Sequence, residues 1–147
     1  MNIKIRDMNE SHREEVISMM KTFYSSSAVY TEGSEDIFIN DFNSCVSEGP
    51  YSEGFIFEEG KVVCGYGMVS KSFSTEFGKP CIWIEDIYIK EGFRGKGIGK
   101  EYFDFLGRKY TGVIFRLEVQ EENSAAIHLY KKEGFDILPY TEMKKIN

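Results

Sequence analysis

The sequence contains few of the residues that cross-link a chain or bind metals. Its 147 residues include 3 cysteines and 2 histidines. The cysteines are widely spaced and form no C-x-x-C pair, so neither a disulfide framework nor a zinc site is encoded. The histidines lie far apart without ligand spacing, and we expect no metal. The residues in question are Cys45, Cys64, Cys81, His12 and His128.

The chain also lacks the signals of membrane or nucleic-acid proteins. No run of about 18 apolar residues occurs, and residues 1–7 alternate apolar and charged side chains instead of forming the apolar core of a signal peptide. The net charge of −6 disfavours a nucleic-acid backbone as the main partner. We therefore expect a cytoplasmic protein with reduced thiols and with neither membrane nor nucleic acid among its partners.

The composition is that of a globular protein. Hydrophobic residues make up 41% of the chain and aromatic residues 15%, which argues against disorder. With only 3 prolines and no low-complexity segment, no linker divides the sequence. The length fits one domain, residues 1–147.

Hydrophobic periodicity predicts the order β, α, α, β, β, β, α, β, α and then a tail of strand character. The first helix follows a capping-box pattern, Ser11-x-x-Glu14. This order predicts an α/β or α+β fold with a mixed sheet. The expected helices cover 12–24, 34–46, a segment after Gly97 and a segment from Asn123 to Gly134; the expected strands cover the N-terminus, a hairpin within 55–66, then 81–90, 113–119 and the tail 136–146.

The stretch from Arg94 to Lys100 is rich in glycine and lies between a predicted strand and a predicted helix. It matches neither the Walker A spacing nor the dinucleotide pattern G-x-G-x-x-G. Unpaired N–H groups at a helix start bind anions, and residues 90–100 carry four basic side chains against one acidic. A phosphate-bearing ligand fits this turn, although a glycine turn with ordinary surface lysines would have the same sequence.

The strand before this turn changes its apolar phase. Ile82 and Ile84 occupy even positions, whereas Ile87 and Ile89 occupy odd ones, so the phase slips at Glu85-Asp86. A one-residue bulge would restore it and would free backbone groups near a ligand site. A central strand that is apolar on both faces is the alternative.

Taken together, these pieces resemble the GNAT superfamily of acyl-CoA-dependent N-acyltransferases. The resemblance spans about residues 80–135, and its strand resembles the diamine and polyamine branch. It implies a mixed central sheet of about six to seven strands, a bulged central strand and helices on both faces. The matching segments are Ile84-Glu85-Asp86-Ile87-Tyr88-Ile89, Arg94-x-x-Gly97-x-Gly99, Asn123-Ser124-Ala125-Ala126 and Leu129 through Phe135.

The resemblance implies that acetyl-CoA is the cosubstrate. Its pyrophosphate would lie on the amides of the glycine turn, and its pantetheine arm would pair with the bulged strand like an added strand. Asn123 would meet the cosubstrate from the last helix, and its ordinary role is that of a helix N-cap. The residues assigned to the cosubstrate in this way are Ile87, Tyr88, Ile89, Arg94, Gly95, Lys96, Gly97, Ile98, Gly99, Lys100, Asn123 and Ala126.

The same resemblance assigns Tyr130 as the general acid that protonates the departing CoA thiolate. Glu85 is the candidate base, because only a neutral amine can attack the thioester. Strand alternation directs Asp86 to the opposite face, unless the bulge alters it. Without the family, Tyr130 would be a core aromatic and Glu85 an exposed strand residue.

Residues 22–60 contain eight acidic side chains and no lysine or arginine. In the resembled fold, the link between the first two helices lies over the acceptor site. Glu32, Glu35 and Asp36, together with Glu85, would then bind a cationic amine. A solvated acidic face is the alternative.

We therefore predict an N-acetyltransferase that acts on a primary amine, without a covalent enzyme intermediate and without a metal. The small-molecule amine is one acceptor class, and a protein lysine or N-terminus is another. The alternative outside catalysis is a regulatory module that binds acyl-CoA. Many proteins of the resembled fold are dimers, so a homodimer is one expected state.

Overall fold

The computed structural model describes residues 2–147. Its elements follow the predicted order, with two additional short 3₁₀ helices, η1 and η2. The bounds are β1 Ile3–Asp7, η1 Glu10–His12, α1 Arg13–Tyr24, α2 Glu35–Val46, β2 Ser52–Glu59, β3 Val62–Ser74, β4 Lys79–Ile89, η2 Glu91–Phe93, α3 Ile98–Lys109, β5 Ile114–Leu117 and α4 Ser124–Lys132.

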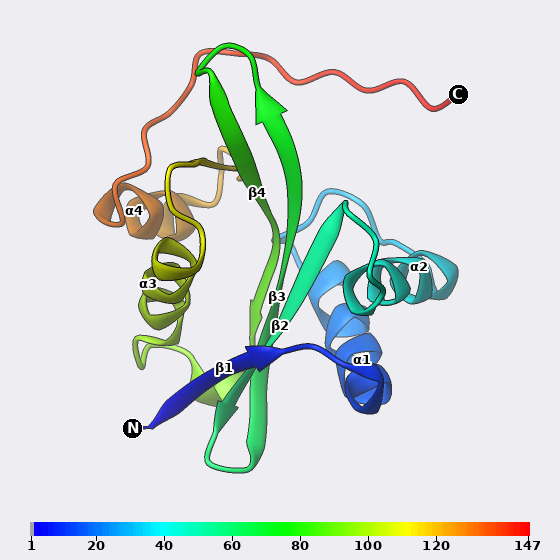
Figure 1. Cartoon of the computed structure of the whole chain (residues 1–147). Helices are drawn as coiled ribbons and strands as arrows, with labels where there is room; N and C mark the ends of the chain where they lie inside the picture. Colours follow the sequence, from blue (N-terminus) through cyan, green and yellow to red (C-terminus); the bar gives the residue numbers. More distant parts are fainter. Residues whose placement is uncertain (1) are drawn as a thin grey trace.

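The strands form one mixed sheet in the order β1-β2-β3-β4-β5. The first three pairs are antiparallel, and β5 runs parallel to β4. The expected six to seven strands are not found among residues 2–147, because the segment 136–146 forms no strand. A strand needs a neighbouring edge to pair with, and this segment runs past the end of the sheet without pairing (Figure 1).

Helices cover both faces of the sheet, as predicted. In Figure 1, α1 and α2 lie on one face and α3 and α4 on the other. The core on the α1/α2 face includes Val16, Met20, Phe42 and Tyr66. The core on the α3 face includes Phe55, Phe57, Val69, Ile98 and Tyr102. Alternation along the strands therefore supplies both cores.

The predicted bulge in β4 is confirmed at Glu85. Val69 of β3 pairs with Ile84, and the preceding Met68 pairs with Asp86, so Glu85 has no partner on β3. Ile84 before the bulge and Ile87 after it consequently pack in the same core, on the α3 face. The slip in apolar phase therefore marks a real irregularity of the backbone.

The start of α1 differs from the prediction. The capping box is formed two residues earlier, by Asn9 and His12 around η1, instead of by Ser11 and Glu14. The Ser11 hydroxyl and backbone N–H both donate to Asn9 Oδ1, at 2.5 and 2.9 Å. Asparagine is at least as good an N-cap as serine, and here it precedes serine in the chain.

Within residues 2–147, no helix is long and apolar enough to cross a membrane. The same residues contain no group of three or more His, Cys, Asp or Glu side chains that could hold a metal ion.

Candidate active site

Strands β4 and β5 pair over only part of their length. Their register runs from Cys81 opposite Ile114 to Ile84 opposite Leu117, where β5 ends. Beyond this point β4 continues to Ile89 with β3 on one side only. The backbone of residues 85–89 is thus unpaired on the side of β5, and it forms the wall of a large cavity.

This cavity has a volume of about 1060 Å³. Its lining comes from segments far apart in the sequence: the loop after α1, helix α2, the second half of β4, the end of β5, helix α4 and the C-terminal tail. We refer to it as the central cavity. Residues that line it include Ser26, Val29, Thr31, Asp41, Glu85, Asp86, Ile87, Tyr88, Ile89, Arg94, Glu118, Asn123, Tyr130 and Glu142.

The glycine turn lies where β4 leads into α3, at one end of the cavity. Gly95 and Gly97 have positive φ values of 77° and 83°, and Gly97 is the N-cap of α3. No side chain caps this end, and the first backbone bond of the helix runs from Glu101 N–H to the Gly97 carbonyl. The N–H groups of residues 98–100 therefore precede the first turn's bonds and are available to an anion.

The turn has open space around it. A Cβ at Gly95 or Gly97 would meet no protein atom within 4 Å, and one at Gly99 would meet only Leu129, at 3.8 Å. A turn that needs left-handed backbone and leaves its surface uncovered is suited to the close approach of a ligand. The local geometry thus fits the predicted phosphate site.

The basic side chains near the turn have different partners. Lys90 forms an ion pair with Glu15 of α1, and Lys100 Nζ lies 2.9 Å from Asp104. Arg94 donates a 2.8 Å hydrogen bond to the Ile89 carbonyl, and its guanidinium lies over the Tyr88 ring. Arg94 therefore fastens the turn to the end of β4, and two of the four predicted basic side chains are already neutralised.

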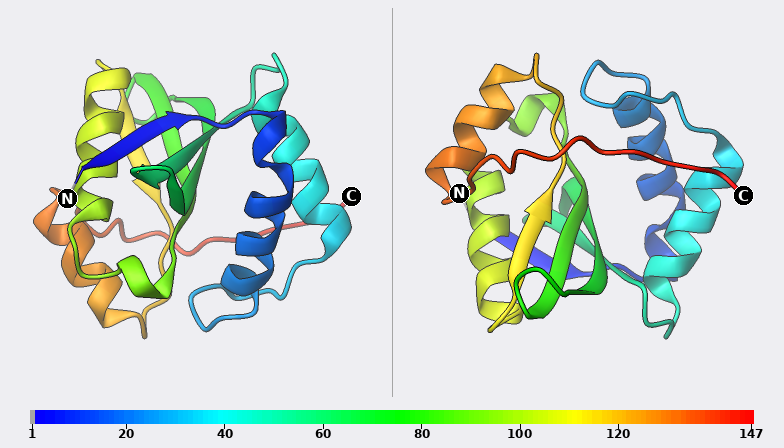
Figure 2. Two further views of the ribbon diagram at one scale, coloured as in Figure 1. Left: turned by 90° about the horizontal axis from the view of Figure 1, so that it is seen from below. Right: turned by 90° about the horizontal axis from the view of Figure 1, so that it is seen from above.

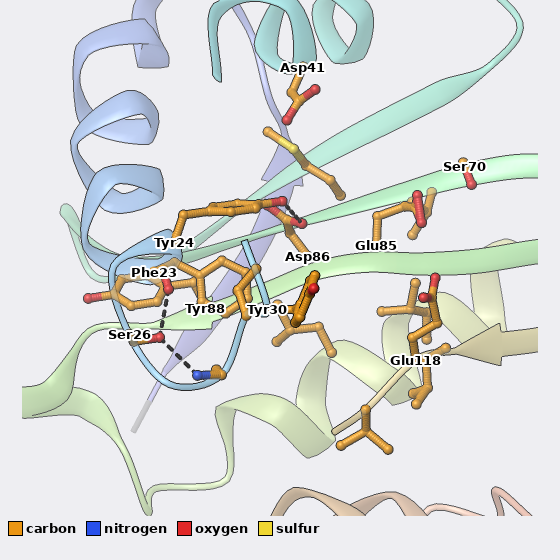
Figure 3. A pocket seen from close by; sticks show the side chains of 18 of the residues that line it. Phe23, Tyr24, Ser26, Tyr30, Asp41, Ser70, Glu85, Asp86, Tyr88 and Glu118 are labelled. Atoms are coloured by element: carbon orange, nitrogen blue, oxygen red, sulfur yellow. Dashed lines mark hydrogen bonds between the residues drawn. The ribbon is translucent and has the colours of Figure 1, made fainter. Parts of the chain in front are cut away.

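Asp86 lies on the α1/α2 face, buried beneath the cavity. Its carboxylate accepts a hydrogen bond from Tyr24 Oη at 2.9 Å (Figure 3). It accepts a second one from Tyr66 Oη at 2.8 Å. Burial raises the pKa of Asp86, and the two tyrosine hydroxyls act in the opposite direction. Strand alternation predicted Asp86 on the face opposite to Glu85 unless the bulge altered it; the bulge lies at Glu85, and both residues line the central cavity.

Other carboxyl groups stand around Asp86. Burial, followed by the charge of Asp86, raises the pKa of Asp41 on α2 to about 6. Glu85 opens into the cavity, and burial and the carboxylates of Asp86, Asp41 and Glu142 raise its pKa. A hydrogen bond with Glu142, burial and the charges of Glu142 and Glu85 raise the pKa of Glu118 to about 7. This end of the cavity is acidic, and ion pairs to these residues are absent from residues 2–147.

Tyr130 lines the cavity from α4. Its ring packs edge-on against Phe103 at 5.9 Å and Phe135 at 6.1 Å. Burial raises its pKa, and its hydroxyl has no hydrogen-bond partner among the described residues. Asn123 is the N-cap of α4 and accepts from Ala126 N–H at 3.2 Å. Tyr130 therefore packs in an aromatic cluster and Asn123 caps α4, and both residues also line the central cavity.

The predicted acidic set on the first link lies elsewhere. Glu32, Glu35 and Asp36 are exposed and do not line the cavity, and Glu35 pairs with Lys21 at 3.2 Å. The link itself contributes residues 26–31 to the cavity wall. The acidic residues that do line it come from α2, β4, the segment after β5 and the C-terminal tail, so no single local pattern would have grouped them all: Asp41, Glu85, Asp86, Glu118 and Glu142.

Comparisons with known proteins agree with this geometry. A sequence model of the acetyltransferase (GNAT) family matches residues 14–135. The thialysine N-epsilon-acetyltransferase of Bos taurus is 36% identical over 91 residues, which cover 57% of this chain and 51% of that protein. The chain thus spans about half the length of the curated relatives that it matches.

Two solved structures show the same fold. A possible acetyltransferase from Clostridium difficile 630 has a TM-score of 0.84 at 17% identity, covering 99% of this chain and 97% of that one. The aminoglycoside N-acetyltransferase AAC(6')-Iy, in complex with the bisubstrate analogue CoA-S-monomethyl-acetylneamine, has a TM-score of 0.80 at 18% identity, covering 100% of this chain and 99% of that one. At such identities the likeness concerns the fold.

Proposed function

The chain belongs to the GNAT acetyltransferase family, and from this premise we propose that it transfers an acetyl group from acetyl-CoA to a small cationic amine. One observation carries the proposal: the unpaired edge of β4 leads, through η2 and the glycine turn, into an uncapped helix N-terminus. The first feature suits an amide-bearing arm that pairs like a strand, and the second suits a pyrophosphate.

The residues present fit acetyl-CoA as cosubstrate. The amides of Ile98, Gly99 and Lys100 would hold the pyrophosphate, and the open surfaces of Gly95 and Gly97 leave room for it. Residues 87–89 would pair with the pantetheine arm, because the side of β4 that faces β5 is free there. When bound, acetyl-CoA supplies the acetyl group as a thioester. Arg94, Lys96, Asn123 and Ala126 complete the proposed set around the arm and the pyrophosphate.

Glu85 is proposed to take the proton of the amine. A primary amine of pKa about 10.4 is neutral only about once in 2,500 molecules at pH 7, a deficit of about 4.6 kcal/mol. A carboxylate whose pKa is raised has a pKa closer to that of the amine, and it therefore accepts the proton of the amine more readily. Glu85 has such a pKa, and its side chain opens into the cavity next to the free edge of β4.

Tyr130 is proposed to act on the departing thiolate. Its raised pKa keeps the hydroxyl protonated at neutral pH, ready to donate. A tyrosine of pKa about 10 is a weaker acid than a thiol of about 8.5, so full transfer costs about 2 kcal/mol or more. Tyr130 therefore stabilises the thiolate first by a hydrogen bond, and proton transfer follows late in the reaction.

The acidic end of the cavity favours a cationic acceptor. Asp86 is buried and Asp41 is half-buried, neither has a basic partner within residues 2–147, and a bound ammonium would compensate their charges. Because carboxylates also raise the pKa of an ammonium that they bind, the reacting nitrogen should be a different one. A molecule with two amines, such as a diamine or polyamine, meets both conditions.

Glu32, Glu35 and Asp36 are proposed to act on the acceptor from outside the cavity, through their field. Neutralising all three, as Glu32→Gln, Glu35→Gln and Asp36→Asn, should raise the amine KM at low salt and have little effect at high salt. The acetyl-CoA KM should not change. An unchanged amine KM at low salt would assign these three residues to a solvated face.

A turnover screen tests the proposed function. Purified protein, acetyl-CoA and a thiol reagent would be combined with diamines, polyamines, amino acids, aminoglycosides and lysine peptides. Thiol release that requires a diamine or polyamine supports the proposal, and release with lysine peptides alone would make the protein a protein acetyltransferase. If CoA binds but no amine causes thiol release, the protein would be a noncatalytic module that binds acyl-CoA.

A further inference from the structure

Helix α2 faces the sheet with two different kinds of side chain. In both views of Figure 2, α1 and α2 lie together on one side of the sheet, and Phe38 and Phe42 of α2 are buried in the core on that side. Ser44 and Cys45 follow Asp41 by three and four positions, which places these three residues on one side of the helix. All three are half-buried and line the central cavity. Because they are small or polar, the second half of α2 leaves space above the sheet.

The sheet beneath this space is polar as well. Ser52 of β2 lies opposite Ser70 of β3. Ser70 comes two residues after Met68, which packs in the core on the α1/α2 face, so both serines lie on that face. Both line the central cavity, and Ser52 Oγ is hydrogen-bonded to Ser44 Oγ of α2. We refer to Ser44 and Ser52 as the serine pair.

The serine pair and Glu85 stand at opposite ends of a polar row that crosses the strands. Glu85 is the bulge residue of β4 and lies beside Met68 and Val69 of β3, next to Ser70. Glu85, Ser70 and Ser52 therefore follow one another on three neighbouring strands, and Figure 3 labels Ser70 and Glu85 in the wall of the cavity. Since neighbouring strands are about 4.8 Å apart, the serine pair lies about 10 Å from Glu85.

The charges along this row are unevenly distributed. Asp41 precedes Ser44 by one turn of α2, Asp86 follows Glu85 on β4, and the charge of Asp86 contributes to the raised pKa of Asp41. Next to the serine pair, burial raises the pKa of the Cys45 thiol to about 12, so the thiol is uncharged at neutral pH. The row thus contains, in order, the proposed base, two carboxyl groups and an uncharged end that forms hydrogen bonds.

We propose that Ser44 and Ser52 bind the far end of the acceptor and thereby make the protein selective for long linear amines with a third nitrogen. The inference rests on the proposed function, because it places the reacting nitrogen at Glu85. An extended chain of roughly eight or nine single bonds spans such a distance, since each bond of about 1.5 Å advances the chain by somewhat less. A linear triamine with four and then three methylenes between its nitrogens has this length. Its middle nitrogen would lie near Asp41 and Asp86, and its terminal ammonium would donate to the serine hydroxyls.

Two matched amines test this selectivity. The first is the triamine just described, and the second is the same molecule with a methyl group in place of the amine on the three-methylene arm. Product analysis would count only acetylation of the amine on the four-methylene arm. For this product, kcat/KM should be about 10-fold or more higher with the triamine, because a charged donor forms hydrogen bonds with the serine pair. Equal values of kcat/KM for the two amines would overturn the proposal.

The double variant Ser44→Ala/Ser52→Ala should abolish this preference, because both hydroxyls that bind the terminal ammonium are removed. Ser72→Ala is the matched control. Ser72 lies two residues beyond Ser70 on the same strand, is exposed and does not line the central cavity, so this variant should keep the full preference. If the double variant loses stability but keeps the preference, the serine pair only packs α2 on the sheet and the proposal is wrong.

Calorimetry in the presence of CoA, which carries no acetyl group, separates this proposal from the proposed function. The unmodified protein should bind the triamine about 10-fold or more tightly than the methyl analogue, and the double variant should bind both alike. That result without thiol release in the turnover screen would refute acetyl transfer to these amines but would support the serine pair as an amine site. Thiol release together with equal binding of the two amines would support the function and refute the role of the serine pair.

Discussion

Tyr66 of β3 and Asp86 of β4 lie diagonally across neighbouring strands, and the tyrosine hydroxyl lies 2.8 Å from a carboxylate that is buried in the core. Tyr24 supplies a second hydrogen bond to the same carboxylate from α1. Buried carboxylates are tolerated only when they are well hydrogen-bonded, so the two tyrosines allow a negative charge to persist beneath the central cavity. This arrangement links the packing of the sheet to the proposed binding of a cation.

Tyr66→Phe should therefore destabilise the protein by about 1–3 kcal/mol at pH 8, because a buried acceptor loses a donor. The loss should be smaller at low pH. Burial raises the folded-state pKa of Asp86, so the unfavourable ionisation of this group is absent below its unfolded pKa and increases as pH rises through the folded value. Urea denaturation at several pH values measures both effects.

Tyr110→Phe is the matched control for this substitution. Its hydroxyl also donates to a carboxylate, Glu53, at 2.7 Å, but Glu53 keeps an ion pair with Lys71 at 2.6 Å. The control should cost less at pH 8 than Tyr66→Phe does. Equal losses for the two variants would mean that Asp86 is not held as a buried anion.

Asp41→Asn should stabilise the protein at pH 8 and weaken the binding of the amine. Because the folded pKa of Asp41 is about 6 against an ordinary value of 3.8, its ionisation opposes folding as pH rises between these values. Removing that charge should gain on the order of 1–3 kcal/mol at pH 8 and almost nothing below pH 4. Thermal unfolding at several pH values measures the gain in stability, and the KM for the amine measures the loss of binding.

The control for Asp41→Asn lies on the same helix. Asp36 is exposed in the first turn of α2, where a negative charge favours the helix dipole. Asp36→Asn should therefore lower stability slightly, the opposite sign from Asp41→Asn. If both substitutions change stability alike at every pH, then Asp41 does not carry a raised pKa.

Gly97→Asp should abolish binding of CoA, because a carboxylate would face the pyrophosphate at the start of α3. Its φ of 83° also makes any side chain there costly for stability. Gly112→Asp separates the two effects, because Gly112 has a φ of 69° and the same open surroundings but lies between α3 and β5. Calorimetry should show CoA binding in the Gly112 variant only, and equal binding in both would place the phosphate elsewhere.

How far the sequence alone could lead depends on whether a feature is local. The bulge at Glu85 was predictable, because the change of apolar phase between Ile84 and Ile87 can be seen within a few consecutive residues. The end of α4 was also predictable: Gly134 has a φ of 96°, and Phe135 N–H bonds to the Tyr130 carbonyl at 3.0 Å, as in a Schellman motif. Such signals need no knowledge of the tertiary structure.

The predictions that were wrong concern features that depend on residues far away in the sequence. The tail at 136–146 has the composition of a strand, but a strand forms only where it pairs with an edge, and in the described chain the tail pairs with none. Asp41 and Asp86 lie 45 positions apart, and only the packing of α2 on the sheet brings their charges together. The acidic residues of the first link were grouped by sequence proximity, which does not decide which of them face the cavity.

Tyr130→Phe should lower kcat by about 10- to 100-fold while the KM for acetyl-CoA stays nearly constant. The ring would keep its packing against Phe103 and Phe135, and only the hydroxyl would be lost. Single-turnover kinetics shows whether the chemical step is the one affected. Tyr140→Phe, which removes an exposed hydroxyl bonded to Glu76, is the control and should leave kcat unchanged. An unchanged chemical step in the Tyr130 variant would exclude it as the acid.

Glu85→Gln should produce a loss of rate that depends on pH. At pH 7 nearly all of a primary amine is protonated, so the base does most for the rate there; near the amine's pKa of about 10.4 half of the amine is already neutral, and the variant should approach the unmodified enzyme. Glu118→Gln is the control, because it removes a neighbouring carboxyl with a raised pKa and leaves the bulge residue in place. The profile of kcat/KM from pH 6 to 10 distinguishes the two roles. A loss that is uniform across this range would mean that Glu85 positions the amine and that water or another carboxylate takes its proton.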